Sequence, residues 1–186
     1  MKKIEGYDEA QALTGEYELL EAGGYICKII SAKVEKSKTN KEMLVIAFDI
    51  AEGEHKDYFK RRNEGNTSFD RKWPTNGVYR QMLEGENAIG YLKGLMTSLE
   101  ASNQNFKWNW DESKLKGLKF GGLFGREQYE ANDGTLKFAT KLQFIRSVEK
   151  IKNNDFKIPE DKLLNRKNNE LNGEFITVGE DEELPF

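Results

Sequence analysis

The chain has 186 residues, of which 37% are hydrophobic, 33% charged and 11% aromatic, so one domain with a hydrophobic core is expected and a disordered chain is excluded. One cysteine and one histidine exclude an internal disulfide and a zinc site of Cys and His ligands within one chain, and we expect neither a metal nor another cofactor. No stretch approaches the roughly 18 consecutive apolar residues of a membrane span, so no membrane partner is expected, and the single cysteine predicts a protein of the reducing cytoplasm.

The net charge of -3 is unevenly distributed along the chain. Residues 1–23 carry two lysines against six acids, and residues 166–186 carry one arginine and one lysine against six acids. The part between them, residues 24–165, therefore carries +5. A mildly basic middle between two acidic ends is compatible with an anionic ligand, despite the acidic pI.

The predicted elements begin with a leader, residues 1–23, in which residues 8–13 have the pattern of a short helix. Residues 25–34 and 43–50 are rich in β-branched and apolar side chains, and a polar turn at residues 36–41 separates them. This arrangement predicts a long hairpin.

A third strand is expected at residues 57–62, followed by the turn-rich segment 63–85. Residues 86–101 contain the clearest helical pattern, because apolar side chains recur there every three or four residues. A short second helix is expected at residues 111–117, with Asp111 as its N-terminal cap.

Two strands, residues 118–130 and 135–148, end the predicted domain, and the Asp133-Gly134 turn between them is a strong hairpin signal. The apolar residues of the last strand, Leu136, Phe138, Leu142 and Phe144, alternate with basic and polar ones, so one face of this strand is apolar. Phe138 and Phe144, together with Phe48, are assigned to the core. Three glycines of the preceding strand predict a bulge or a close backbone approach to a ligand: Gly121, Gly122 and Gly125.

Three strands, a helix and two strands are the element order of an OB-fold. We therefore predict a mainly β fold with one or two helices: a five-stranded OB-fold-like barrel, with its helix between strands three and four. The barrel domain is expected to span residues 24–150. Residues 151–186 are interpreted as a polar linker and a flexible acidic tail.

The chain ends in six residues that combine acids with apolar side chains: Asp181, Glu182, Glu183, Leu184, Pro185 and Phe186. The terminal ring can enter a pocket on a partner, while the acids steer the tail onto a basic rim. The tail is therefore expected to bind partner proteins, and a merely solvated acidic end is the alternative.

This ending resembles that of bacterial and phage single-stranded DNA-binding proteins, which close with acidic residues and a Pro-Phe pair, although Ile is usual where this chain has Leu184. The barrel region is also similar to uncharacterised phage proteins with a Gly-Tyr start, a Lys/Ser/Thr-rich first turn and a Met-Leu-rich second strand, here Gly24-Tyr25, residues 36–41 and Met43-Leu44. The resemblance implies that the barrel binds single-stranded DNA in a bacterial host cell, and that the tail recruits replication or recombination proteins.

Sequence-tolerant binding of single strands needs cations for the phosphates and aromatic rings on which bases stack. Several segments of this chain interleave the two, and the predicted DNA-binding residues are Lys36, Lys38, Lys41, Tyr58, Lys60, Arg61, Arg62, Arg71, Lys72, Trp73, Tyr79, Lys137 and Lys141. The alternative for each is a core aromatic or a solvated cation. For Trp108 and Trp110, packing against the barrel is the expectation.

Motifs for catalysis are missing, since the sequence has no phosphate loop and no Gly-x-Ser-x-Gly elbow, and His55 has no Ser or Cys nucleophile near it. We therefore expect a non-catalytic protein with no catalytic residues, and a plain surface position for His55. Two alternatives stay open: an accessory factor that uses the barrel only for protein contacts, and a nuclease with a dispersed acidic site. The oligomeric state is also open, including a homo-oligomer.

Overall fold

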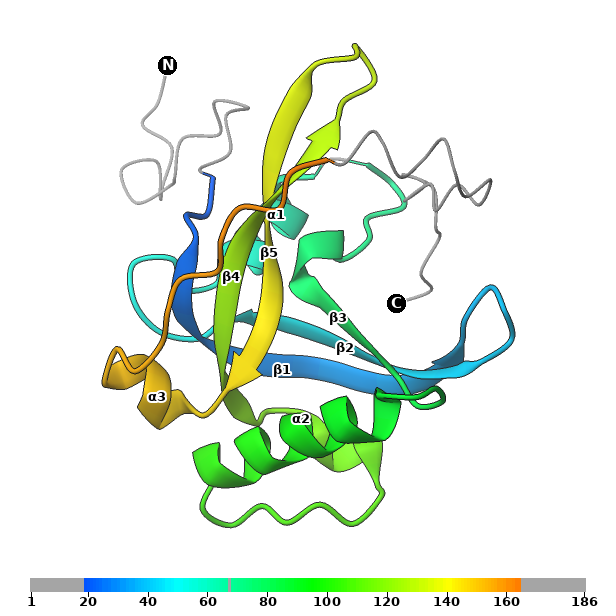
Figure 1. Ribbon diagram of the computed structural model, residues 1–186, viewed down its shortest axis with the longest axis vertical. Helices are drawn as coiled ribbons and strands as arrows, with labels where there is room; N and C mark the ends of the chain where they lie inside the picture. The colour runs from blue at the N-terminus through cyan, green and yellow to red at the C-terminus, as the bar shows by residue number, and fades with distance from the viewer. Residues whose placement is uncertain (1–18, 67, 165–186) are drawn as a thin grey trace, which may run out of the picture.

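One antiparallel sheet of five strands forms the centre of the structure, a computed structural model that describes residues 19–66 and 68–164 (Figure 1). The strands lie side by side in the order β3-β2-β1-β4-β5. Their bounds are Gly23–Lys36 for β1, Glu42–Ile50 for β2, Val78–Met82 for β3, Lys119–Glu130 for β4 and Leu136–Arg146 for β5. The predicted helix at 8–13 and the predicted partner-binding tail at 181–186 lie outside the described residues.

The predicted mainly β fold and its element order are confirmed, because helix α2, Ala88–Ser102, lies between β3 and β4 in the chain. The predicted closure into a barrel is wrong, since β3 and β5 do not pair and are the two edges of the sheet. β3 has only five residues, and the 3-10 helix η1, Thr75–Gly77, contacts β5 just before β3 begins. The segment before β3 therefore contacts β5 through a 3-10 turn. In a closed barrel, a strand would pair with β5 at this position.

The segment predicted as the third strand, residues 57–62, instead begins helix α1, Tyr58–Gly65, which is a correction of that prediction. The carboxylate of Asp49, at the end of β2, accepts the N–H of Phe59 at 2.9 Å and the N–H of Lys60 at 3.0 Å. The first amides of a helix have no partner inside the helix, so this carboxylate stabilises the helical start. The true third strand lies in the segment expected to be turns.

Four phenylalanines form the centre of the core, on the inner face of the sheet. Phe48 is fully buried and edge-on to the rings of Phe59, Phe120 and Phe124, at centroid distances of 5.5, 5.6 and 6.1 Å. Edge-to-face contacts of this kind add to the stabilisation from burial. The core assignment of Phe48 is confirmed.

Helix α2 covers one end of the sheet with the apolar side chains of Leu95, Met96 and Leu99, all of them buried (Figure 1). The helical pattern predicted for residues 86–101 is confirmed. The short helix predicted near residue 111 is the 3-10 helix η2, Glu112–Leu115. None of the helices in the described ranges is long and apolar enough to span a membrane.

A β-bulge in β5 overturns the predicted core position of Phe144. Leu142 pairs with Phe124 of the core, whereas Phe144 pairs with Leu123, so Gln143 is an extra residue without a partner across the ladder. An extra residue reverses the alternation of the side chains that follow it. Phe144 therefore points to the outer face and is 46% exposed.

The predicted core position of Phe138 is also wrong, for a different reason. Phe138 pairs with Gln128 and stays on the inner face, but on the half of the β4–β5 hairpin that projects from the body of the molecule (Figure 1). It is 38% exposed, and the guanidinium of Arg126 lies 5.2 Å from the centre of its ring. Leu136, two residues nearer the tip of the hairpin on the same face, is 45% exposed.

Helix α3, Val148–Lys152, packs on the outer face of β4 at Gly121. A Cβ atom at this glycine would lie 2.7 Å from the carbonyl oxygen of Ser147 and would overlap the side chain of Ile151. The group that approaches this glycine closely belongs to the chain itself, whereas a bulge or a ligand was expected from the sequence.

Residues 155–164, which we call the β4 strap, run along the part of β4 that β1 does not cover. The N–H of Gln128 donates to the carbonyl oxygen of Lys162 at 2.8 Å, and the N–H of Lys162 donates to that of Arg126 at 2.9 Å. The ammonium group of Lys162 lies 3.0 Å from the carboxylate of Glu127. Contacts with the sheet thus continue past residue 150, where the domain was expected to end.

Candidate nucleic-acid interface

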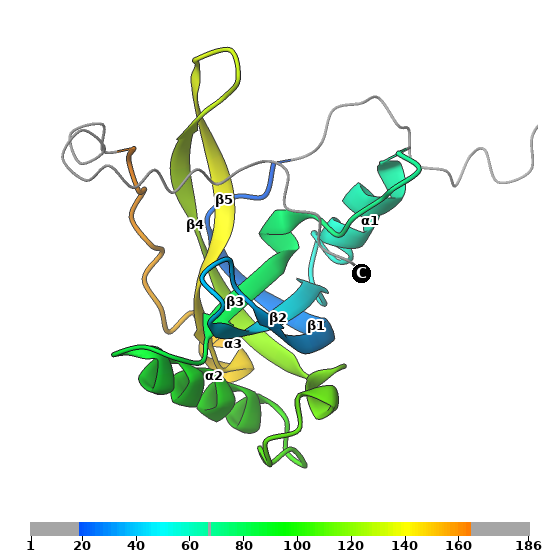
Figure 2. The same ribbon diagram turned by 90° about the vertical axis from the view of Figure 1, so that its right-hand side faces the viewer.

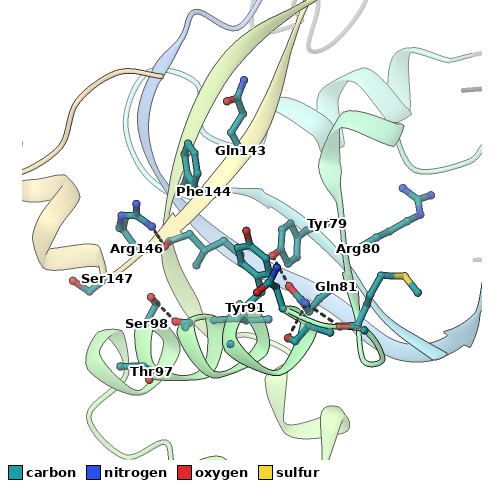
Figure 3. A pocket seen from close by; sticks show the side chains of 18 of the residues that line it. Tyr79, Arg80, Gln81, Tyr91, Thr97, Ser98, Gln143, Phe144, Arg146 and Ser147 are labelled. Carbon is teal, nitrogen blue, oxygen red and sulfur yellow. Dashed lines mark hydrogen bonds between the residues drawn. The ribbon is translucent and has the colours of Figure 1, made fainter. Parts of the chain in front are cut away.

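The unpaired edges of β3 and β5 border a groove whose floor is α2 (Figure 3). The groove has a volume of about 1220 Å³. This is larger than most small-molecule pockets, which have roughly 300 to 1000 Å³. The open seam of the sheet therefore creates a concave site that can hold part of a polymer.

Three aromatic side chains line the groove, each from a different element: Tyr79 of β3, Tyr91 of α2 and Phe144 of β5. Tyr91 is 66% exposed and Phe144 is 46% exposed, so both offer a ring face to a ligand. Tyr79 is half-buried, and its hydroxyl donates to the side-chain oxygen of Gln81 at 2.9 Å. Burial raises the pKa of Tyr79, so this phenol is neutral at physiological pH.

Gln81 fixes the corner where the groove meets the start of α2. Its side chain is 5% exposed, and its amide nitrogen donates to the carbonyl oxygens of Met82 at 2.8 Å and Ala88 at 3.3 Å. Because the amide also accepts the hydroxyl of Tyr79, one buried side chain holds the strand edge, the tyrosine and the helix together. The groove is therefore formed before any ligand arrives.

Three cations lie around the rings: Arg80 of β3, Arg146 at the end of β5 and Lys150 of α3. The guanidinium of Arg146 lies 5.3 Å from the centre of the Phe144 ring, which is within cation–π distance. Figure 3 shows Arg80 on the β3 side of the groove, with its guanidinium group extending away from Phe144 and Arg146. Cations beside exposed rings suit a ligand that combines negative charge with flat groups.

The floor of the groove consists of small residues of α2: Gly90, Gly94, Thr97, Ser98 and Ala101. A Cβ atom at Gly90 or Gly94 would meet nothing within 4 Å, so the surface of the helix is open to a ligand. Two acids, Glu84 and Glu86, line the end beside the start of α2. With three cations and two acids, the lining carries a net charge of +1.

Most of the residues predicted to bind DNA lie outside this groove. The lysines of the β1–β2 turn are exposed at the end of a hairpin that extends to the right in Figure 1: Lys36, Lys38 and Lys41. Arg71 and Lys72 belong to the segment before η1. Lys137 and Lys141 share the outer face of β5, as predicted, where each lies near an acid: Asp133 at 3.8 Å and Glu127 at 3.1 Å.

Helix α1 carries the predicted cations Lys60, Arg61 and Arg62, and Figure 2 shows it far from α2 and the floor of the groove. Tyr58, at its start, is 5% exposed and packs edge-on against Phe59 at 5.1 Å. A base cannot stack on a buried ring, so Tyr58 serves the core.

Trp73 is half-buried and packs against the core. Its indole N–H donates to the carbonyl oxygens of Phe48 and Gly77, both at 3.2 Å. These bonds fasten the segment before β3 to the sheet. The structure therefore gives the indole a structural use that its place among charged residues did not indicate.

Of the residues predicted to bind DNA, Tyr79 alone lines the groove. Arg80 stood beside it in an interleaved basic and aromatic pair, and this signal could have identified it. Tyr91 lies on an amphipathic helix without an adjacent cation, and the bulge hid the outward direction of Phe144 and Arg146. These residues can be recognised as neighbours only in the folded structure.

A family model described as "Protein of unknown function (DUF669)" matches residues 5–108. The match includes β3 and α2, two of the elements that border the groove, and ends before β5. No curated protein matches the chain. Because the matched residues are more than half of the 186 in the chain, this protein belongs to the DUF669 family, whose function is unknown.

Proposed function

We propose that this protein binds single-stranded DNA without catalysis, in the groove between β3, β5 and α2. The observation that carries the proposal is the combination of exposed rings, Tyr91 and Phe144, with two cations among the lining of one preformed groove, Arg146 and Lys150. Single strands expose both phosphates and ring faces, and binding without base preference uses cations for the former and stacking for the latter.

A duplex is the poorer ligand for the same site, because its bases are already stacked on one another. Phe144 and Tyr91 could then contact only the sugar-phosphate backbone. With a net charge of +1, the lining gives a duplex little compensation for the lost stacking. The proposal therefore includes a preference for single strands.

The C-terminal residues 181–186 extend the proposal beyond the groove. Their acidic and apolar sequence, with its likeness to single-stranded DNA-binding proteins, supports recruitment of replication, recombination or repair proteins. The barrel-region likeness to phage proteins supports a phage-encoded protein that acts in the cytoplasm of a bacterial host.

The proposal is tested by anisotropy titration of a fluorescein-labelled dT oligonucleotide and of a matching duplex, at low and moderate salt. We expect tight, salt-sensitive binding of the single strand and weak binding of the duplex. Phe144→Ala should weaken single-strand binding about 5-fold to 150-fold, since one stacked base contributes about 1 to 3 kcal/mol. Phe138→Ala is the matched control, because that ring also lies beside an arginine but on the opposite face of the hairpin.

Absence of binding to either nucleic acid at low salt would overturn the proposal. The alternative, an accessory factor that contacts only proteins, would then take its place. Equal losses from Phe144→Ala and Phe138→Ala would leave DNA binding in place but remove it from the groove.

A further inference from the structure

Trp110 lies in the loop between α2 and η2 with a left-handed backbone, at a φ of 66°. The other non-glycine residues with positive φ in the described ranges are Asn40, Asp57 and Asn154, whose short polar side chains tolerate it. A bulky indole does not, so this conformation is strained. The side chain is also 79% exposed, so its burial does little to offset the strain.

The loop around Trp110 is firmly held on both sides. The side-chain amide of Asn103 donates to the carbonyl oxygens of Leu99 and Lys119, both at 2.8 Å. The backbone N–H of Trp108 donates to the carboxylate of Glu100 at 2.9 Å. The exposed indole is therefore presented by a fixed backbone.

The residue after the indole is anchored as well. Asp111 accepts the N–H of Ser113 at 3.1 Å and so begins η2. On the other side, the ring of Trp108 lies 6.0 Å from that of Trp110, at an angle of 53°, and Trp108 packs against the core. In this pair, the ring of Trp108 packs against the core and the ring of Trp110 faces solvent.

The charges beside Trp110 are balanced. Lys107 lies 3.3 Å from Glu100, and Lys114 lies 3.7 Å from Asp111. A balanced surface does not attract phosphates strongly, so a ligand here would be held through the ring itself. An exposed flat ring on a rigid loop suits stacking with another flat ring, whereas an apolar side chain of a partner protein binds best in a pocket.

The loop that carries Trp110 follows the C-terminal end of α2, the helix that forms the floor of the proposed groove. Ala101 of α2 lines the groove, whereas its neighbour Glu100, which holds the backbone of Trp108, does not. A strand that continues from the groove to Trp110 would therefore have to pass around this end of α2.

We propose that Trp110 is a second stacking position, outside the groove, which takes an unpaired nucleobase of the same single strand. The inference rests on the proposed function, and the strained backbone is retained for this contact. The contribution of the Trp110 ring to binding is insensitive to salt, in contrast to that of the groove cations.

The test uses the full chain and two dT oligonucleotides, of about 5 and about 20 nucleotides, which bracket the site sizes of about 4 to 16 nucleotides of single-strand binders. Tryptophan fluorescence and anisotropy are followed together. The long oligonucleotide should quench the fluorescence by stacking on Trp110, and the short one should bind with little quenching. Trp110→Asn should weaken binding of the long oligonucleotide about 5-fold or more, and leave the short one unchanged.

The same variant separates binding from folding. Asn suits a left-handed backbone, so Trp110→Asn should unfold at the same or a higher temperature than the native chain. Phe69→Asn is the control, since Phe69 is also fully exposed in a loop and should change neither binding nor stability. A lower melting temperature, or equal binding of the long oligonucleotide, would overturn the stacking role. If the native chain binds neither oligonucleotide, the proposed function itself fails.

Discussion

Asp49 fixes helix α1 to the end of β2 through a carboxylate that is only 3% exposed. It accepts the N–H groups of Ile50 at 2.8 Å, Phe59 at 2.9 Å and Lys60 at 3.0 Å. Burial raises the pKa of this carboxyl, and the three hydrogen bonds act against the rise. A buried carboxylate is stable only with such donors, so the donors and the carboxylate depend on one another.

Asp49→Ala should therefore lower the free energy of unfolding by about 2 to 4 kcal/mol, because each buried N–H left without an acceptor costs about 1 to 3 kcal/mol. Urea denaturation measures the change. Asp57→Asn is the control, since Asp57 is exposed, makes no side-chain cap hydrogen bond and has a left-handed backbone that Asn tolerates. A destabilisation no larger than that of the control would contradict this account of α1.

The same residue explains why a helix was predicted as a strand. In the sequence, the aromatic and basic run at residues 58–62 has the composition of a strand. Its helical start depends on a carboxylate at position 49, in another element. Local propensity could not include that contact, and the hydrogen bonds decided the outcome.

At the scale of elements, Glu127 of β4 joins three segments. Its carboxylate lies 3.1 Å from the ammonium of Lys141 on β5 and 3.0 Å from that of Lys162 on the β4 strap. Burial raises the pKa of Glu127, but the hydrogen bonds and charges of the two lysines outweigh it, so the pKa lies below its ordinary value. The strap is thus held by these charges in addition to its backbone hydrogen bonds to β4.

Glu127→Gln should loosen the β4 strap without unfolding the sheet. Hydrogen exchange should show faster exchange at the amides of Gln128 and Lys162, which bond across the strap, while the core strands stay protected. Since these groups are partly exposed, moderate to high salt should produce the same effect in the native chain. Glu160→Gln, at an exposed acid of the strap, should leave the exchange unchanged.

The strap should also loosen in acid. A carboxyl whose folded-state pKa is lowered stabilises the folded contact above its unfolded pKa, about 4.3 for Glu, and loses that contribution as the pH falls through the lower folded value. Exchange at the amide of Lys162 should therefore become faster below about pH 4 in the native chain, relative to the ordinary pH dependence. The same pH dependence in Glu127→Gln would contradict the role of this carboxylate.

Elements with strong periodic signals were predictable from the sequence. The β1–β2 and β4–β5 hairpins, α2 and η2 were all found, because each has its own pattern or turn residues. The direction of Phe144 was not, since a single extra residue, Gln143, reverses the alternation and leaves no mark on composition. Two of the six aromatic and basic residues that line the groove, Phe144 and Arg146, were lost from the prediction for this reason.

At the scale of the whole molecule, the groove exists because the sheet stays open between β3 and β5. The predicted barrel would have placed paired strands there and moved the binding surface to the loops. The sequence carries the ingredients of the site, namely a basic middle and interleaved rings. Whether these side chains come together between β3 and β5 depends on the length of β3 and on the pairing of distant strands. No local sequence pattern encodes either.

The acidic C-terminal segment should compete with DNA for the basic part of the molecule. Residues 166–186 carry a charge of -4, against +5 for residues 24–165. Removal of residues 166–186 should therefore tighten binding of a dT oligonucleotide at low salt, and the gain should shrink as salt screens the charges. Unchanged or weaker binding after the deletion would exclude this competition.

The most direct test of the central claim compares the salt dependence of dT binding, measured by anisotropy, between the native chain and the groove variant Arg146→Gln/Lys150→Gln. The control variant is Lys93→Gln/Lys157→Gln, which removes two exposed cations from outside the groove. If the groove binds the strand, the groove variant should lose about tenfold or more in affinity, and its slope of log affinity against log salt should become shallower by about 1.4, since each lost phosphate contact contributes about 0.7. The control should follow the native chain. Equal affinity and slope in all three proteins, or no binding by the native chain, would contradict the account.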